Sequence, residues 1–308
     1  MANKLNRSPL FYVGDKYKLL NEILPYFPKD VDRFIEPFTG GGSVFLNVEA
    51  KKHLLNDIDK NVCLLHKFLM KHSKNPETFF KEVERIILEY NLSRSFKEDI
   101  VPAELKLKFK KTYYAKFNKD NFNKLKSDFN NSEQDNLYKF YVLLIYGFNR
   151  MIRFNRSGNY NLPVGNVDFN RNVVDALNSY FVNVKKANIE INNLDYLDFL
   201  KKVKPTKKDF LYFDPPYLIT FSEYNKLWNE KNEIDLITTL DKLNKAGVRF
   251  AVSNVTHYKE KENKTFNDWS KKYNVLPIKS NYISYHDNSI KTFKEVLITN
   301  YEHKSIRI

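Results

Sequence analysis

The sequence predicts an α/β fold with a doubly wound, mostly parallel β-sheet, because short apolar runs alternate with helical patterns along the chain. The apolar run at residues 33–35 leads into a glycine-rich turn. A helical pattern follows, with Val44, Phe45 and Val48 on one face, and a second apolar run covers residues 53–57. This order of strand, turn, helix and strand is typical of a βαβ unit.

Later apolar runs predict three further strands, at residues 210–213, 248–252 and 295–298. A helix is expected over residues 234–246, because Gly247 follows in the position of a C-cap. Since strands keep alternating with helices, we expect helices on both faces of the sheet.

The character of the sequence changes between residues 62 and 184, where lysine-rich helical patterns replace the strands. Gly147 is the first glycine of this stretch. We therefore expect one domain formed by residues 1–61 and 185–308, which contains the sheet, and a helical insertion formed by residues 62–184.

Composition limits the class of protein. The 308 residues suffice for one large domain or two modest ones, and the formal net charge of +14 favours a polyanionic partner such as nucleic acid. A solvated lysine-rich surface from an A/T-biased genome would give the same charge. Cys63 is the single cysteine, which excludes intramolecular disulfides and cysteine-rich zinc sites. We find no signal peptide and no membrane span, so a cytoplasmic protein is expected.

The strongest motif is Asp214-Pro215-Pro216-Tyr217, at the end of the predicted strand 210–213. Ligands bind outside the carboxyl ends of strands in open α/β sheets. Two prolines fix the backbone and remove two N–H donors, which leaves carbonyl oxygens beside a rigidly held acid and aromatic ring. A purely structural turn after the strand is the alternative.

Two further features surround the first predicted strands. Residues 38–42 form a glycine turn that lets a ligand approach the backbone, although the segment fits neither a dinucleotide fingerprint nor a P-loop. Asp57 follows the second strand, where a carboxylate can accept both hydroxyls of a ribose. Asp57 and Asp59 also precede a helix, so one of them can be its N-cap, and we favour Asp57 for the ribose.

In this order the motifs resemble the alpha-class (Dam-like) N6-adenine DNA methyltransferases. The resemblance is carried by the aspartate-proline-proline-tyrosine motif and by six other segments, at residues 11–16, 36–42, 56–59, 147–165, 198–199 and 253–254. Departures from the family pattern are small. Tyr12 replaces a common tryptophan, Asp15 a common glycine, and a triple glycine stands for Gly-x-Gly.

The resemblance implies a Rossmann-like S-adenosylmethionine-dependent methyltransferase fold. Residues 1–61 and 185–308 would be the catalytic domain, and 62–184 a helical target-recognition domain with a β-hairpin near 151–165. The cofactor would be S-adenosylmethionine, with no metal. Its implied contacts are Tyr12, Lys16, Glu36, Phe38, Gly40, Gly42, Asp57, Asp198, Phe199 and Asp214.

The implied reaction is methylation of the exocyclic amine of an adenine flipped out of double-stranded DNA. The catalytic residues would be Asp214, Pro215, Pro216 and Tyr217. DNA contacts are expected from Asn149, Arg150, Met151, Arg153, Asn155 and Arg156. We assign Arg153 to a base and Arg156 to a phosphate; the alternative for the arginines is phosphate contact alone.

Other interpretations of the function remain open beside DNA adenine methylation. Within the same superfamily, an RNA adenine methyltransferase or a glutamine methyltransferase competes, although the glutamine enzymes resemble Asn-Pro-Pro-Tyr where this chain has Asp214. A catalytically inactive DNA-binding protein and a nicotinamide dehydrogenase are the alternatives from other classes. The protein is expected to be a monomer without a membrane partner. Either an orphan Dam-like methylase or a restriction-modification methylase with a cognate restriction endonuclease encoded nearby fits the sequence, and the DNA target stays open.

Overall fold

The computed structural model describes residues 5–98, 100–220, 228–279 and 293–303. It divides into two compact units. The helical unit contains Met1–Tyr17, Gly40–Leu46 and Asp59–Ala187, and the sheet unit contains Lys18–Thr39, Asn47–Ile58 and Asn188–Ile308. The division of the chain into catalytic and target-recognition domains at residues 62 and 184 stays a prediction.

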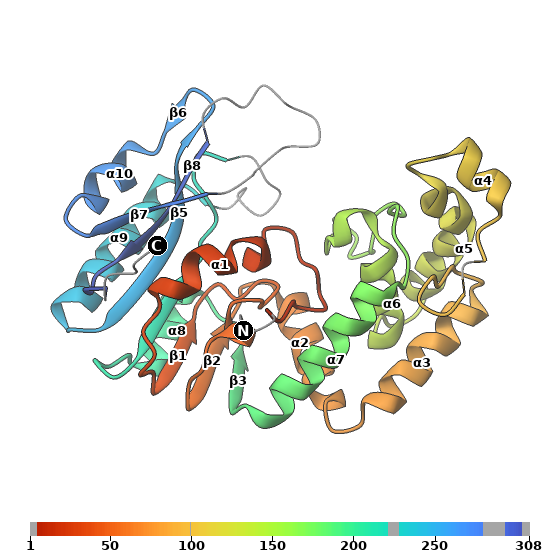
Figure 1. Ribbon diagram of the computed structural model, residues 1–308, viewed down its shortest axis with the longest axis horizontal. Coiled ribbons are helices and arrows are strands. Elements are labelled where there is room, and N and C mark those ends of the chain that lie inside the picture. The colour runs from red at the N-terminus through yellow and green to blue at the C-terminus, as the bar shows by residue number, and fades with distance from the viewer. Residues whose placement is uncertain (1–4, 99, 221–227, 280–292, 304–308) are drawn as a thin grey trace. The chain divides into compact units, whose positions relative to one another are not determined.

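The described strands of the sheet unit form one mixed sheet with the order β3-β2-β1-β4-β5-β8-β7, and β6 pairs with β5 outside this path (Figure 1). Strands β1 to β5 pair in parallel, whereas β8 is antiparallel to both of its neighbours. The predicted α/β fold with a mostly parallel sheet is therefore confirmed. The strands are β1 (Arg33–Glu36), β2 (Lys52–Asn56), β3 (Ile189–Asn192), β4 (Phe210–Phe213), β5 (Arg249–Tyr258), β6 (Lys261–Glu262), β7 (Asn274–Ile278) and β8 (Phe293–Thr299).

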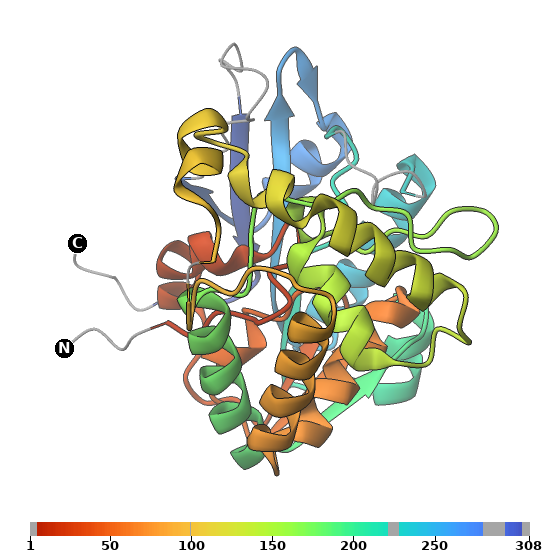
Figure 2. The ribbon, with the colours of Figure 1, turned by 90° about the vertical axis from the view of Figure 1, so that its right-hand side faces the viewer.

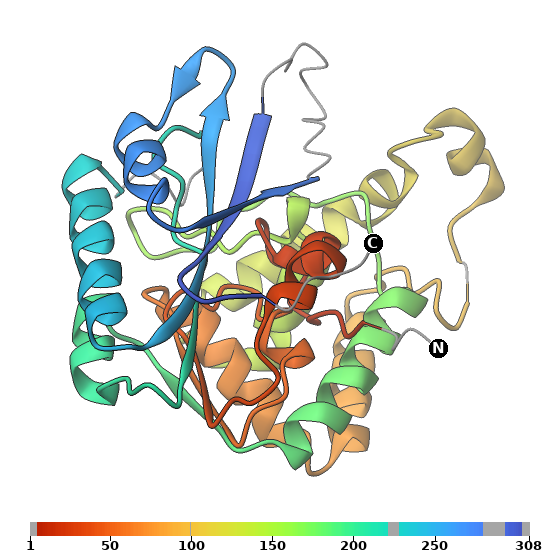
Figure 3. The same ribbon diagram turned by 60° about the vertical axis from the view of Figure 1, so that its left-hand side comes forward.

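Alternation along the strands gives the sheet two apolar faces. Leu211 and Phe213 of β4 belong to a core that also contains α8 (Tyr196–Val203), α9 (Glu230–Lys245) and α10 (Lys264–Ser270). Phe210 and Tyr212 point the other way, toward Phe27. Phe27 follows α1 (Leu20–Ile23) and the 3₁₀ turn η2 (Leu24–Tyr26). Figure 3 shows α8 and α9 on one side of the sheet and α1 on the other.

The structure corrects several local predictions. No α-helix carries Val44, Phe45 and Val48; only the 3₁₀ turn η3 (Phe45–Asn47) forms between β1 and β2. Positive φ at Gly40 and Gly42 interrupts helical backbone just before this point, and too few residues remain before β2 begins. Strands β3 and β7 were not predicted. Helix α9 begins earlier than expected, at a capping box of Asn229 with Asn232, but it ends as predicted before Gly247, whose φ is 70°.

The order of the strands reverses between β1 and β4, which are neighbours in the sheet although other strands separate them in the sequence. Chains leaving the carboxyl ends of such strands diverge and leave a crevice for ligands. Glu36 ends β1 and Pro37-Phe38 begins the loop after it, and the loop after β4 begins with Asp214–Tyr217. The topology thus places two predicted motifs at one edge.

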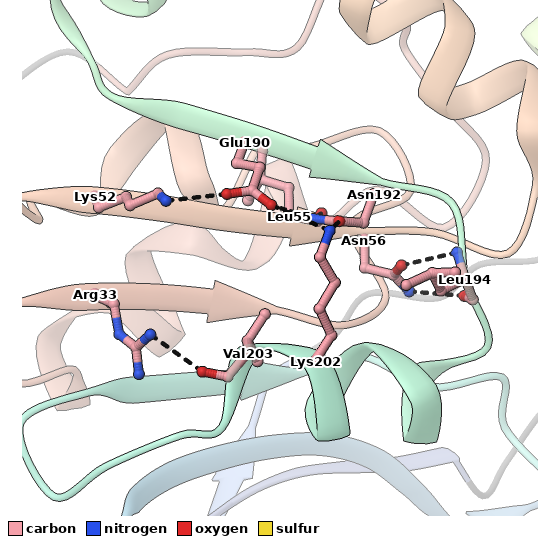
Figure 4. Close-up of polar contacts among 9 residues, drawn as sticks. All are labelled: Arg33, Lys52, Leu55, Asn56, Glu190, Asn192, Leu194, Lys202 and Val203. Atoms are coloured by element: carbon pink, nitrogen blue, oxygen red, sulfur yellow. Dashed lines mark hydrogen bonds and ion pairs between the residues drawn. The ribbon is translucent and has the colours of Figure 1, made fainter.

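Asn56, the last residue of β2, joins the loops at this edge. Its side-chain Nδ2 donates to the carbonyls of Pro37 and Leu194, at 3.0 Å each, and its Oδ1 accepts from the N–H of Leu194 at 3.0 Å. Figure 4 shows the pair of bonds to Leu194. The side chain is 1% exposed, so water cannot replace these bonds. The chain segments after β1, β2 and β3 are therefore tied to one another.

The helical unit is built around a helix that is apolar on every side, α6 (Leu137–Tyr146), whose residues 140–146 are all buried. The other helices are amphipathic or short and are seen in Figure 2. They are α2 (Lys60–His72), α3 (Pro76–Glu89), α4 (Ala103–Lys108), α5 (Tyr113–Asn130), the 3₁₀ turn η4 (Phe148–Arg150) and α7 (Arg171–Lys186). The predicted helical character of this stretch is confirmed. Within the described ranges, every helix is too short or too polar to span a membrane.

A hairpin follows η4. Phe154 pairs with Tyr160 and Gly147 with Val164 in antiparallel bridges. Gly158, with a φ of 78°, lies in its turn. The N–H of Asn155 donates to the carbonyl of Asn159 at 2.8 Å, and a second bond joins Asn161 to Arg153 at 3.1 Å. The local hairpin geometry predicted near residues 151–165 is present.

We expect Asn56→Ala to lower the free energy of unfolding by about 2 to 3 kcal/mol, because it leaves buried carbonyls and an N–H without partners. Urea denaturation followed by circular dichroism measures this. Asn131→Ala is the matched control, since Asn131 is exposed and should change the free energy by less than about 0.5 kcal/mol. Equal stability of Asn56→Ala and wild type would show that the loops hold together without this amide.

Candidate active site

The loop after β4 places an acid and a phenol beside a second, buried acid. The hydroxyl of Tyr217 lies 3.0 Å from Oδ1 of Asp214 and 3.0 Å from Oε1 of Glu295. Glu295 belongs to β8 and is 3% exposed. Its carboxylate reaches the motif because β8 is the antiparallel neighbour of β5, which lies next to β4.

One phenol cannot donate fully to two carboxylates, because it carries a single proton. Burial raises the pKa of Tyr217 well above its usual value, and the charges of Asp214 and Glu295 raise it further. Tyr217 therefore keeps its proton. The hydrogen bond can pass between the two carboxylates by rotation of the hydroxyl alone.

Glu295 was missed by the reasoning from sequence. The available signal was an acid inside the apolar run of β8, Phe293–Thr299, where a charge is costly to bury without a donor.

The two prolines of the loop contribute carbonyl oxygens. Neither proline has an N–H, and Pro215 is buried. Among the residues that the structure describes, no donor bonds to the carbonyl oxygen of Pro215 or of Pro216. These oxygens are therefore available as acceptors next to the Asp214 carboxylate.

At the carboxyl end of β2, Asp57 is partly exposed, and its backbone is held by Asn193. The Nδ2 of Asn193 donates to the carbonyls of Asp57 and Ile58 at 2.8 and 2.9 Å. The N-cap of α2 is Asp59, whose side chain accepts from the N–H of Asn61. The two acids thus differ in role, and Asp57 is not the cap. Ile58 is 71% exposed, a large apolar side chain beside a carboxylate.

Phe38 lies in an aromatic cluster with Tyr196 and Trp228, at ring-centroid distances of 5.1 and 5.8 Å. The Tyr196 hydroxyl is buried and finds no partner within the described ranges. Trp228 is fixed by Glu233, which accepts from its indole N–H at 2.7 Å. The cluster follows β1 and β3 and sits beside the Asn56 bonds.

The two predicted cofactor contacts Asp198 and Phe199 lie in different environments from each other. Phe199 is fully buried in the core, and Asp198 is exposed on α8, where it pairs with Lys201 at 2.9 Å. Asp195 and Tyr196 begin the same helix, directly after β3, and Asp195 caps it by accepting from the N–H of Leu197. The sequence did not single out these two residues, although an acid and an aromatic there mark a helix start after a strand.

In the helical unit, Asp15 fixes the glycine turn. Its Oδ2 accepts from the hydroxyl of Ser43 at 2.6 Å, and its Oδ1 accepts from the N–H of Tyr17 at 3.0 Å. A Cβ on Gly41 would lie 2.8 Å from that Oδ2 and 3.0 Å from Cβ of Tyr12. Asp15 and the triple glycine are two of the three departures from the family pattern, and in the structure they are in direct contact.

His66 supports the turn from α2. Its Nε2 lies 3.0 Å from the carbonyl of Gly40, so it must carry the hydrogen, and Nδ1 then accepts from the Tyr180 hydroxyl at 3.2 Å. Burial lowers the pKa of His66 to about 4, which keeps the ring neutral. A Cβ on Gly42 would lie 2.9 Å from this ring, and Gly42 has a φ of 82°. Position 42 therefore demands glycine.

The predicted DNA-contact residues occupy different environments. Asn149, Asn155 and Arg156 are exposed, and Met151 is partly exposed. Arg153 crosses the hairpin, where its Nε donates to Oδ1 of Asn161 at 2.9 Å and its Nη2 to the carbonyl of Asn161 at 3.1 Å. Arg150 is half-buried against the ring of Phe11.

Comparison with known proteins agrees with these motifs. The family model for the D12 class N6 adenine-specific DNA methyltransferase matches residues 12–283. The chain is 34% identical to modification methylase StsI of Streptococcus sanguinis, across 100% of this chain and 45% of that protein. It is 35% identical to type II methyltransferase M.FokI of Planomicrobium okeanokoites, across 97% of this chain and 44% of that protein.

The DNA adenine methylase of Escherichia coli (strain K12) is 27% identical, across 70% of this chain and 66% of that protein. The chain spans less than half the length of StsI and of M.FokI.

The Asp15 carboxyl gives a pH-dependent stability. Burial raises its pKa from 3.8 to about 6. A pKa raised by folding gives a stabilising contribution that is complete below pH 3.8 and is lost as pH rises through about 6. We expect Asp15→Asn, which keeps the size of the side chain but cannot ionise, to lack this loss.

The measurement is the free energy of unfolding of both proteins between pH 4 and pH 7. Wild type should lose about 2 kcal/mol relative to Asp15→Asn over this window. His66 is present in both proteins, so its opposite contribution, which falls away as pH drops toward 4, cancels in the difference. A difference that does not change with pH would mean that Asp15 is not a buried, titrating group.

Proposed function

This chain belongs to the D12 class of N6 adenine-specific DNA methyltransferases, and from that membership we propose that it transfers a methyl group from S-adenosylmethionine to the exocyclic amine of an adenine in double-stranded DNA. The reaction would be that of a site-specific adenine DNA methyltransferase, EC 2.1.1.72. The observation that carries the proposal is the loop after β4, where the Asp214 carboxylate is followed in the chain by two proline carbonyls that accept no hydrogen bond from the described residues.

The adenine amine is a poor nucleophile, because its lone pair is delocalised into the ring. Two acceptors on its two N–H bonds can draw the nitrogen toward tetrahedral geometry and free the lone pair. Asp214 supplies one acceptor and the carbonyl of Pro215 or Pro216 the other. One proton must leave the nitrogen as it gains the methyl group, and the Asp214 carboxylate is positioned to take it. Tyr217 would also stack on the base.

Tyr217 and Glu295 prepare Asp214 for this role. The Tyr217 hydroxyl lies 3.0 Å from Oδ1 of Asp214, and we propose that this oxygen is the one that accepts from the amine. Glu295 offers the hydroxyl an alternative acceptor at the same distance. Transfer of the hydrogen bond to Glu295 would make Oδ1 of Asp214 available to the amine while the Tyr217 hydroxyl stays hydrogen-bonded.

The residues fit S-adenosylmethionine, which when bound supplies a methyl group already activated on a sulfonium. The glycine turn is a cradle that side chains at Gly41 or Gly42 would fill. The buried Tyr196 hydroxyl, which has no partner among the described residues, suits a polar edge of a nucleoside. The exposed side chain of Ile58 suits an apolar edge. We assign the ribose of the cofactor to Asp57. The other proposed cofactor contacts are Tyr12, Lys16, Glu36, Phe38, Gly40, Gly42 and Asp214. Asp195 and Tyr196 join this set in preference to Asp198 and Phe199.

We further propose that residues 1–61 and 185–308 form the catalytic domain and that 62–184 recognise the DNA. Support comes from the hairpin, whose exposed Asn155 and Arg156 lie in a tight turn narrow enough to enter a groove. The guanidinium of Arg153 donates two hydrogen bonds to Asn161, so Arg153 would present its remaining N–H groups to a base from a fixed position. The likeness to StsI and M.FokI favours a role in restriction and modification.

Methyl transfer from radiolabelled S-adenosylmethionine to unmethylated double-stranded DNA tests the function. We expect wild type to label adenine, and Asp214→Ala to be slower by at least about a hundredfold while it still binds DNA. RNA and protein substrates serve as controls for acceptor class. Labelling of RNA alone would overturn the function, and an Asp214→Ala rate within tenfold of wild type would overturn the mechanism.

A double-mutant cycle tests the Tyr217 hydroxyl. Glu295→Gln should lower the single-turnover rate about tenfold, the value of one hydrogen bond to a charged group. In a Tyr217→Phe background the same change should have almost no further effect, because Glu295 acts through the hydroxyl.

Asp241→Asn is the matched control, since Asp241 also accepts a phenol hydrogen, from Tyr273 at 2.8 Å. It should lower stability without changing the rate. Additive effects of Tyr217→Phe and Glu295→Gln on the rate would reduce Glu295 to a structural role.

A further inference from the structure

Two arginines of the helical unit share one aromatic ring. The guanidinium carbon of Arg7 lies 4.5 Å from the centroid of the Phe11 ring, and that of Arg150 lies 4.0 Å from it. Phe11 is 7% exposed. The two cations come from the N-terminal segment and from η4, which are far apart in the sequence.

Neither cation has an anionic partner among the residues that the structure describes. Within the described part of the chain, Arg7 and Arg150 form no ion pair, and the buried Nε of Arg150 lacks an acceptor. The nearby acids are engaged elsewhere. Asp15 accepts from Ser43 and Tyr17, and Asp168 accepts from Ser95. They act on the arginines only through space, Asp15 on Arg7 and Asp168 on Arg150, and the phenol of Tyr141 also acts on Arg150 through space.

Holding two arginine charges on one buried ring costs free energy when no anion is bound. Burial lowers the pKa of Arg150 to about 10, and the charge of Arg7 lowers it as well, yet both side chains remain cationic at neutral pH. Two like charges held on an apolar ring gain little from it beyond the cation–π contact.

The backbone around the arginines is strained. Phe11 has a φ of 48°, and Asn149 and Arg150 each have a φ of 51°. Such conformations persist only where neighbouring contacts impose them. Here the hydroxyl of Tyr141 donates to the carbonyl of Pro9 at 3.0 Å, and the N–H of Arg150 donates to the carbonyl of Gly147 at 3.0 Å. The cluster is therefore built, and not an accident of two flexible side chains.

We propose that Arg7 and Arg150 form a binding site for one phosphodiester of the DNA, with Phe11 as its apolar floor. The proposal rests on the proposed function. Guanidinium groups bind phosphate oxygens through paired N–H donors, and an apolar floor strengthens those bonds by excluding water. Arg150 was a candidate DNA contact from the sequence, whereas Arg7 was not singled out.

A carboxylate of the methyl donor is the other anionic group that the site could meet. S-adenosylmethionine carries a sulfonium and an ammonium besides its carboxylate, so its net charge is positive. Two unpaired arginines repel such a molecule and attract a polyanion. The charges of the site therefore favour the DNA backbone.

The test is equilibrium binding of a duplex oligonucleotide by Arg7→Gln at several salt concentrations. We expect affinity to fall about tenfold and the slope of log Kd against log salt to shrink by about one, the contribution of one neutralised phosphate. Arg85→Gln is the matched control. Arg85 is also an arginine of the helical unit, but it is paired with Glu82 and Glu89, and its loss should leave both quantities unchanged.

Three further measurements separate the explanations. A duplex with single methylphosphonates, which are neutral, should contain one position that weakens wild type more than it weakens Arg7→Gln, in which Arg150 alone remains. Arg7→Lys should fold like wild type and keep the salt slope while losing part of the affinity. The affinity for S-adenosylmethionine should not change in either variant.

Unchanged DNA affinity and slope in Arg7→Gln would overturn the proposal. So would a loss of affinity for S-adenosylmethionine, which would assign the site to the cofactor carboxylate. Failure of Arg7→Gln to fold would transfer the test to Arg7→Lys and the methylphosphonate scan. These binding results do not depend on methyl transfer, so an inactive wild type would refute the proposed function without deciding this site.

Discussion

The buried amide of Asn56 is the interaction on which the geometry of the sheet unit's carboxyl edge depends. Parallel strands bring their carboxyl ends to one edge, but the chain leaving each strand is free to diverge. Asn56 ties the segments after β1 and β3 to the end of β2. Glu36, Phe38, Asp57 and Tyr196 all lie within a few residues of those bonds. Their positions follow from one side chain that is neither catalytic nor exposed.

Two kinds of polar group can be distinguished among the described residues. The buried Glu233 and the partly exposed Asp241 each accept from several donors, and such complete satisfaction is what a structural role requires. The Tyr217 hydroxyl has one proton for two carboxylates, and the Nε of Arg150 has no acceptor within the described ranges. Incomplete or shared bonding is costly to stability, and it is found where we propose that base and backbone of DNA bind.

The glycine turn shows how a departure from a family pattern can be absorbed. The carboxylate of Asp15 takes the space that a side chain at position 41 would need, and it replaces that side chain's packing with a bond to Ser43. His66 closes the turn from the other end by donating to Gly40. The turn is held by polar bonds in which one partner is a titrating acid, so its rigidity is coupled to pH.

Local patterns in the sequence were enough for the features that depend on neighbouring residues. The four-residue strand β4, the end of α9 at Gly247, the helical insertion and the motifs of the family could all be read from the chain. Strands β3 and β7 could not, because Ile189–Asn192 is short and only partly buried, and Asn274–Ile278 is largely exposed and contains a proline.

The partners of Tyr217 and of the arginines were decided by the tertiary structure. Glu295 reaches Tyr217 because an antiparallel strand lies beside β5, and Arg150 reaches Phe11 because the helical unit folds the N-terminal segment onto η4. Hydrophobic periodicity records which face of an element is buried, but only the packed chain determines which buried charge meets which donor.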